Sequence, residues 1–230
     1  MTEHKDIYAS HGDLYERLVE REDYQHNILA AIQEIIPVKG KDVVETGAGT
    51  GRLTRILAPH VRSIQAFDAS QHMLNYAIAA LERSGLRNWS TGVSDHRALP
   101  AADGSADIAI SGWSICYLVD WNREGWSAEV ERALAEMRRV LRPGGVTILL
   151  ETQGTGYETP HPPEHLVEYY SMLERLGFTF RWIRTDYAFE SAQEARELSA
   201  FFFRETFEGV MSGGERPILP ECTGIWWKRV

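Results

Sequence analysis

A glycine-rich turn is the clearest candidate for ligand chemistry in this sequence. Residues 45–51 read Glu-Thr-Gly-Ala-Gly-Thr-Gly. Glycines in such a turn let the backbone bend tightly and approach a ligand without a Cβ clash. Asp68 stands at the end of the next apolar segment, where a carboxylate can accept hydrogen bonds from both hydroxyls of a ribose. Together these residues predict a nucleoside site, and Asp68 is also suited to capping a helix that starts near Ser70.

The spacing of the glycines distinguishes between two nucleoside cofactors. Dinucleotide sites use G-x-G-x-x-G, whose third glycine lets a helix pack close to the pyrophosphate. Here that position is Arg52, and the spacing is G-x-G-x-G. Glu45 precedes the turn, where a carboxylate repels a pyrophosphate but suits a ligand with an ammonium and a sulfonium. The pattern therefore favours S-adenosylmethionine over a nicotinamide dinucleotide.

Composition narrows the class of protein further. The 230 residues are 43% hydrophobic and 25% charged, as in ordinary globular domains. We find no apolar run near the roughly 18–20 residues that span a bilayer, and no secretory signal at the N-terminus. Cys116 and Cys222 form neither a disulfide framework nor a metal-ligand pattern. We therefore expect a cytoplasmic protein without a metal.

The net charge of −9 bears on the partners of the protein. Such a charge opposes broad attachment to nucleic acid or to an anionic membrane. We therefore expect a small-molecule partner, no nucleic acid and no membrane.

Short apolar runs alternate with amphipathic stretches from residue 40 onward. We expect strands and helices in the order strand 42–46, helix 50–59, strand 62–67, helix 70–84, strands 89–93 and 106–111, helix 129–141 and strand 146–150. Strands that alternate with helices imply crossover connections. The fold class is therefore α/β, a three-layer sandwich with helices on both faces of a mostly parallel sheet.

The flanking segments complete a single predicted domain, 1–230. Residues 1–36 have helical spacing and form an N-terminal helical cap, and residues 40–152 form the cofactor-binding core. Residues 153–230 complete the sheet and supply a substrate cover. Their expected elements are a helix at 164–176, a strand at 178–183, a helix with a capping box at Ser191 and Glu194, and a strand at 224–230.

Four ordered blocks give the core a family resemblance. They read VVETGAGTGRLT, AFDAS followed by Met73, SDHRALPAADGSADIAIS, and MRRVLRPGGVTILLE. Over residues 40–152 the chain resembles the class I S-adenosylmethionine-dependent methyltransferases, and it is similar to the small-molecule group that includes the ubiquinone and menaquinone methyltransferases. This resemblance implies a Rossmann-like, seven-stranded sheet whose last strand, 224–230, is antiparallel.

The resemblance also implies roles for individual residues around the cofactor. It places three glycines and a nearby acid at the methionine moiety: Gly47, Gly49, Gly51 and Glu45. Asp68 holds the ribose, Ala69 or Met73 packs against adenine, Asp95 accepts from the adenine amino group, and His96 contributes mainly backbone. Ser111 and Trp113 lie beside the sulfonium and the acceptor. Other roles stay open, because Met73 and Trp113 suit core packing and Asp95 suits a local turn.

The acceptor side is expected in the segment from Gly154 to Cys222. Gly154, Gly156, Gly213 and Gly214 allow movement, and Tyr157 offers apolar surface as a substrate-binding residue. Phe201–Phe203 suits helix packing more than a substrate box. The candidate general bases are the histidines of the flanking loops, His11, His161 and His165, and Tyr8 and Tyr15 are candidates for closing over the cofactor.

Two histidines four residues apart match the pattern of a metal site, but the residues between them argue against it. His161 to His165 matches H-x-x-E-H, a zinc-peptidase pattern that needs both histidines on one helix. Pro162 and Pro163 keep His161 out of such a helix.

Three functions remain after this reading. The first is a methyltransferase that acts on an unidentified small-molecule acceptor. The second is a regulatory protein that binds S-adenosylmethionine without catalysis, and the third is a nicotinamide-dependent oxidoreductase.

Overall fold

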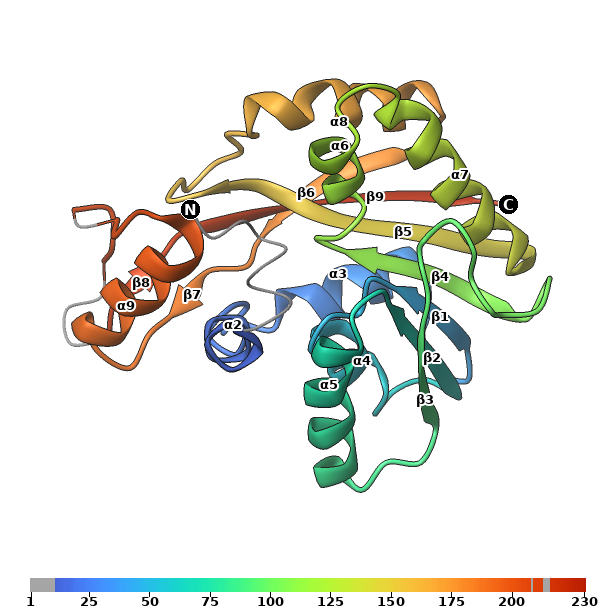
Figure 1. Cartoon of the computed structure of the whole chain (residues 1–230), viewed down its shortest axis with the longest axis horizontal. Coiled ribbons are helices and arrows are strands. Elements are labelled where there is room, and N and C mark those ends of the chain that lie inside the picture. Colours follow the sequence, from blue (N-terminus) through green and yellow to red (C-terminus); the bar gives the residue numbers. More distant parts are fainter. Residues whose placement is uncertain (1–10, 208, 213–215) are drawn as a thin grey trace.

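The computed structural model describes residues 11–207, 209–212 and 216–230 (Figure 1). Its centre is a seven-stranded sheet with the strand order β3-β2-β1-β4-β5-β9-β6. The strands are β1 (Asp42–Thr46), β2 (Ser63–Asp68), β3 (Trp89–Val93), β4 (Ala106–Gly112), β5 (Leu141–Thr155), β6 (Thr179–Arg184) and β9 (Glu221–Arg229). β1 to β5 pair in parallel, whereas β9 runs antiparallel to both β5 and β6. The predicted sheet, mostly parallel with an antiparallel last strand, is confirmed.

Helices cover both faces of this sheet (Figure 1). One layer contains α3 (Asn27–Ile35), α4 (Arg52–Leu57) and α5 (Gln71–Ser84), and the other contains α6 (Cys116–Trp121), α7 (Trp126–Arg139) and α8 (Val167–Arg175). In β1, Val43 packs in the cluster of the first layer and Val44 in the cluster of the second. Successive side chains of a strand face opposite layers, so β1 is buried on both sides.

A third group of elements, which we call the cap, lies at the carboxyl end of β5 (Figure 1). It comprises α2 (Gly12–Val19), α9 (Ala192–Phe203) and the short pair β7 (Tyr187–Ala188) and β8 (Ile218–Leu219). The rings of Tyr15 on α2 and Phe202 on α9 are 5.6 Å apart. The cap therefore joins the N-terminal segment to the C-terminal one, directly above the edge where a parallel sheet forms its ligand crevice.

Several elements differ from their sequence-based expectation. The helix α6 and the pair β7–β8 were not expected, because six residues and two residues are too short to show a hydrophobic period. The helix expected at 164–176 begins as a 3-10 turn, η1 (Glu164–Leu166), and continues as α8. The cap of α9 is as predicted, since the Ser191 side chain accepts from the backbone N–H of Glu194. In the described part of the chain, no helix is long and apolar enough to cross a bilayer.

Candidate functional site

Two adjoining cavities open at the carboxyl end of the sheet. The first, the loop cavity, has a volume of about 510 Å³ and is lined by the glycine-rich turn. The second, the cap cavity, has a volume of about 930 Å³ and is lined largely by the cap and the ends of β5 and β9. Both volumes suit a small molecule. The two cavities share the lining residues Tyr15, Val19, Arg52, Trp113, Tyr117 and Trp121.

The three glycines of the turn have three different tasks. All have positive φ, at +72° for Gly47, +55° for Gly49 and +84° for Gly51. A Cβ on Gly47 would lie 1.9 Å from the hydroxyl oxygen of Ser114, and a Cβ on Gly51 would lie 2.9 Å from the Cβ of Ala77 on α5. A Cβ on Gly49 would meet no atom within 4 Å. Gly47 therefore leaves room for the side chain of Ser114, and Gly51 lets α4 pack on α5. Gly49 lines the loop cavity, so it leaves backbone open to a ligand.

Glu45 lies at the end of β1 and lines the loop cavity. The hydroxyl of Thr54 donates to its Oε2 at 2.6 Å. Burial raises the pKa of Glu45 to about 8, and the charge of Asp68 acts in the same direction. The carboxyl group is therefore protonated at neutral pH in the ligand-free protein, and a cationic ligand would favour its ionised form.

Asp68 ties the glycine-rich turn to the turn after β2. Its carboxylate accepts from the backbone N–H of Gly49 at 2.8 Å and from that of Ser70 at 2.7 Å. The N-cap of α5 is Ser70, whose hydroxyl accepts from the N–H of Met73. The alternative of Asp68 as the helix cap is therefore wrong. Burial raises the pKa of Asp68, and the residue lines the loop cavity, as a ribose acceptor must.

The residues predicted around adenine all line the loop cavity: Ala69, Met73, Asp95 and His96. Met73 is also buried in α5, so core packing is confirmed, and its contact with adenine stays a prediction. Asp95 accepts from the backbone N–H and the guanidinium of Arg97, which holds its pKa down at about 2. The turn role and the cavity position of Asp95 are therefore compatible.

His96 contributes more than the backbone that was expected of it. Its Nδ1 lies 2.7 Å from the hydroxyl of Thr46, and its Nε2 lies 3.1 Å from the hydroxyl of Ser114. Burial lowers its pKa to about 4, so the ring is neutral. The imidazole therefore links the end of β1 to the loop after β4 and stiffens the wall of the loop cavity.

The end of β4 corrects one prediction and supports another. Ser111 is buried inside the sheet, and its hydroxyl has no hydrogen-bond partner among the described residues. It does not line the loop cavity, which is bordered instead by Gly112, Trp113 and Ser114. Trp113 has φ +49° and lies under the guanidinium of Arg52, 3.4 Å from the ring centroid. This pair forms the wall shared by the two cavities.

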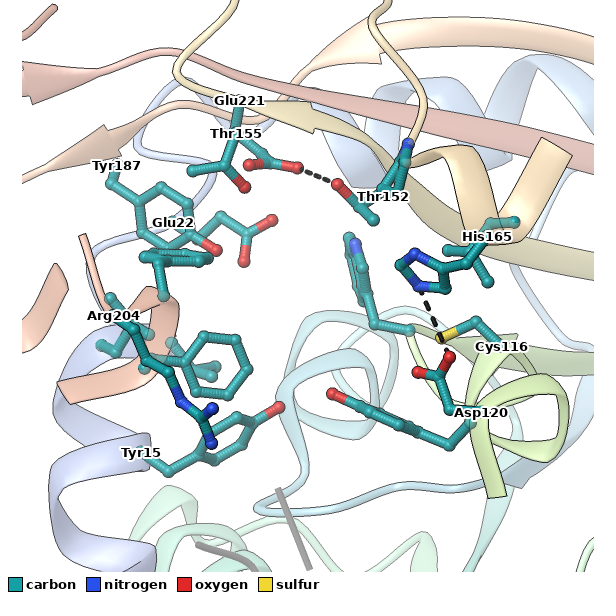
Figure 2. Close-up of a pocket in the computed structure, with 18 of the residues that line it drawn as sticks. Tyr15, Glu22, Cys116, Asp120, Thr152, Thr155, His165, Tyr187, Arg204 and Glu221 are labelled. Carbon is teal, nitrogen blue, oxygen red and sulfur yellow. Dashed lines mark hydrogen bonds and ion pairs between the residues drawn. The ribbon is translucent and has the colours of Figure 1, made fainter. Parts of the chain in front are cut away.

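The cap cavity brings together polar groups from distant segments (Figure 2). Its lining includes Glu22, Tyr187 and Glu221. The hydroxyl of Thr152 donates to Glu221 Oε1 at 2.8 Å, and Arg52 pairs with Glu22. Burial, with the nearby charge of Glu22, raises the pKa of Glu221 to about 8. Sequence reasoning missed both acids, because only the fold brings them together.

Of the three candidate bases, one lines the cap cavity. His165 lies at the cavity, 3.5 Å from Asp120 (Figure 2). His161 stacks on Tyr157 with ring centroids 4.1 Å apart, and neither residue is part of either lining. His11 packs against Phe201, 5.9 Å between centroids, also outside both linings.

Tyr157 as a substrate residue is corrected by this geometry. The backbone N–H of Gly156 donates to the carbonyl of Pro220, and the carbonyl of Tyr157 accepts from Cys222 Sγ. These bonds hold the segment beside the start of β9, where the Tyr157 side chain is 47% exposed. The apolar surface of the cap cavity comes instead from Phe202 and Phe203. Tyr8, Gly213 and Gly214 lie outside the described residues.

Comparisons with known proteins agree with this arrangement. Residues 44–149 match a family model described as a methyltransferase domain. A malonyl-[acyl-carrier protein] O-methyltransferase of Pectobacterium atrosepticum is 34% identical over 107 residues, which cover 46% of this chain and 37% of that protein. A ubiquinone/menaquinone biosynthesis C-methyltransferase of Caulobacter vibrioides is 30% identical over 130 residues, which cover 53% of this chain and 48% of that protein. The chain thus spans less than half the length of these two curated relatives.

The fold is also similar to solved structures. A crystal structure of a SAM dependent methyltransferase from Aquifex aeolicus aligns with a TM-score of 0.57 at 19% sequence identity. The alignment covers 87% of this chain and 88% of that chain. The likeness therefore extends beyond residues 44–149.

Proposed function

We propose that this chain, whose residues 44–149 match a methyltransferase domain model, transfers a methyl group from S-adenosylmethionine to a small-molecule acceptor. The observation that carries the proposal is the pair of cavities that meet at Arg52 and Trp113. A donor site that only stored the cofactor would have no need of a second cavity across its wall. The family prediction from the four sequence blocks is confirmed.

The residues of the loop cavity fit S-adenosylmethionine. The open backbone at Gly49 leaves room for the methionine chain, and Glu45 offers a carboxyl group to a cation. Asp68 offers an acceptor to ribose, and Ala69 and Met73 offer apolar surface to adenine. When bound, S-adenosylmethionine supplies an activated methyl group on a sulfonium.

The cap cavity serves the acceptor in this proposal. The protein must align the nucleophile, keep water out and set the charge around it. Phe202 and Phe203 exclude water, and Trp113 separates the two ligands. His165, held by Asp120, is the candidate base that faces this cavity, and it is needed only for an acceptor that loses its proton during transfer. The names of the relatives, a malonyl-[acyl-carrier protein] O-methyltransferase and a ubiquinone/menaquinone biosynthesis C-methyltransferase, suggest small or carrier-linked acceptors.

The sheet disfavours the nicotinamide alternative. The dinucleotide fold has the strand order 3-2-1-4-5-6, whereas β9 is inserted antiparallel between β5 and β6 here. Arg52 stands where the dinucleotide pattern has its third glycine, which also disfavours a nicotinamide cofactor.

One experiment tests catalysis directly. The purified protein is incubated with S-adenosylmethionine carrying a labelled methyl group and with a small-molecule extract. We expect S-adenosylhomocysteine to form and one or a few metabolites to acquire the label. Binding of the cofactor without label transfer across extracts would instead support the regulatory alternative.

Substitution of Asp68 tests the ribose contact. We expect Asp68→Ala to weaken binding of S-adenosylhomocysteine by about 2 kcal/mol, roughly 30-fold, because the ribose hydroxyls and the N–H of Gly49 lose a charged acceptor. Asp68→Asn should cost less, since one oxygen remains. Calorimetric titration measures both variants, and wild-type affinity in both would remove Asp68 from the site.

A further inference from the structure

The buried end of the cap cavity contains two acidic side chains and one cationic side chain. Glu22 and Glu221 line this end, and Arg52 is the cation beside them. The Glu221 residue is 2% exposed, and the Glu22 side chain is 3% exposed. Arg52 pairs with Glu22, so its charge is already matched. The carboxyl group of Glu221 therefore lacks a cationic partner.

Both acids also keep an oxygen atom without a partner. The hydroxyls of Tyr187 and Thr155 lie beside the two carboxyl groups. Glu22 Oε1 and Glu221 Oε2 are nevertheless buried and have no hydrogen-bond partner of good geometry among the described residues. Figure 2 shows the two carboxyl groups on the same side of the pocket, across from His165 and Asp120. A buried carboxyl oxygen without a donor costs stability, and such groups are normally paired. Two of them at one end of a cavity indicate a ligand that brings the missing donors.

The rest of the cap cavity defines the body of that ligand. Aromatic side chains from four segments line the rest of the cavity, and some of them form the wall shared with the loop cavity: Tyr15, Trp113, Tyr117, Trp121, Phe202 and Phe203. Aromatic faces attract both apolar groups and cations. The remaining charged groups of the lining, Asp120, Arg123, His165 and Arg204, belong to exposed or half-exposed residues.

We propose that the cap cavity recognises an amine, namely a molecule with an aromatic or apolar body whose ammonium group lies between Glu22 and Glu221. The ammonium supplies donors to both unpartnered oxygens, and its positive charge favours the ionised form of Glu221, whose pKa is raised by burial. Held between carboxylates, this nitrogen keeps its proton and anchors the molecule. The identification of this molecule as the methyl acceptor rests on the proposed function.

A matched set of probes tests the charge preference. Phenethylamine, phenethyl alcohol and hydrocinnamate carry one aromatic body with a cationic, neutral and anionic group, respectively. Each is titrated calorimetrically into the ligand-free protein and into the protein saturated with S-adenosylhomocysteine. We expect the amine to bind about tenfold or more tightly than the alcohol, and the anion to bind most weakly. Equal binding of amine and alcohol, preference for the anion, or no measurable binding of any probe overturns the inference.

Two variants locate the preference. Glu221→Gln keeps the shape and the bond from Thr152 but removes the charge, so it should reduce the advantage of the amine over the alcohol to about twofold or less. Glu205→Gln is the matched control, because it removes an exposed carboxylate that lies outside both cavity linings and should leave the advantage unchanged. A full advantage in Glu221→Gln overturns the inference, and the wild-type comparison stands if that variant does not fold.

The two proposals can fail separately. S-adenosylhomocysteine is titrated first and by itself, and absence of its binding contradicts the proposed function whatever the amine does. Binding of S-adenosylhomocysteine together with indifference to the amine contradicts only the inference about the cap cavity.

Discussion

Replacement of Gly49 by valine is expected to abolish measurable binding of S-adenosylmethionine and S-adenosylhomocysteine. The position lines the loop cavity, and a Cβ there would meet no protein atom within 4 Å. The branched side chain therefore occupies space that the ligand needs, without a clash inside the protein. We expect a loss of affinity of about 100-fold or more, which is about 2.8 kcal/mol. Calorimetric titration with S-adenosylhomocysteine measures it.

A variant at a second glycine, Gly104→Val, is the control for the backbone strain that Gly49→Val also introduces. Gly49 has φ +55°, where a side chain costs about 1–2 kcal/mol. Gly104 has φ +59° and likewise no atom within 4 Å of its Cβ position, and it lies outside both cavities. Gly104→Val should lower the melting temperature to a similar degree and leave ligand affinity unchanged. If Gly49→Val binds like wild type, the glycine-rich turn does not hold the cofactor.

The loop cavity was largely predictable because its residues are local in the sequence. The strands β1 to β4 each end at or just before residues that reach the cavity, as with Glu45 in β1 and Asp68 in β2. The carboxyl ends of parallel strands meet at one edge, so order along the chain indicates position in space. The predicted cofactor residues therefore lie together, apart from Gly51 and Ser111.

Ser111 shows how sharply such a prediction depends on the pleat. Adjacent residues of a strand point to opposite faces, so a shift of one position exchanges a buried side chain for one at the cavity. Ser111 is 1% exposed inside β4, and the lining begins at Gly112. A pattern of residue types therefore predicts where the strand ends, but it does not predict which of its last residues lines the cavity.

The cap cavity could not be assembled from the sequence. Its acids lie at Glu22, after α2, and at Glu221, in β9, and these segments meet only because α2 packs against α9 above the sheet. No spacing rule connects positions so far apart. The broad expectation that the segment from Gly154 to Cys222 forms the acceptor side is supported by Thr155, Tyr187 and Phe202 in the lining, and it stays a proposal.

Affinity for S-adenosylhomocysteine is expected to rise steeply with pH between pH 6 and pH 8. Burial raises the pKa of Glu45 to about 8 in the ligand-free protein, and the ammonium of the ligand favours the ionised carboxylate. A group with this pKa is about 1% ionised at pH 6 and about half ionised at pH 8. If binding requires the ionised form, affinity rises roughly 50-fold over this interval, and binding at pH 7 releases close to one proton.

The linkage has the same sign for Glu45 and Glu221, so the two acids are distinguished by the cavity in which each lies. The ligand-free fold binds the proton more tightly than the unfolded chain does, so the contribution of Glu45 to stability falls as pH rises toward 8, while ligand affinity rises. Glu45→Gln cannot ionise and should flatten the pH profile while keeping the bond from Thr54. Glu221→Gln removes an acid whose pKa is also raised to about 8 but which lies in the cap cavity, and it should keep the wild-type slope.

Titrations in two buffers of different ionisation enthalpy give the number of protons released. A flat wild-type profile with no proton release would show that Glu45 does not face the ammonium, whereas loss of the slope in Glu221→Gln would assign the titration to the other cavity.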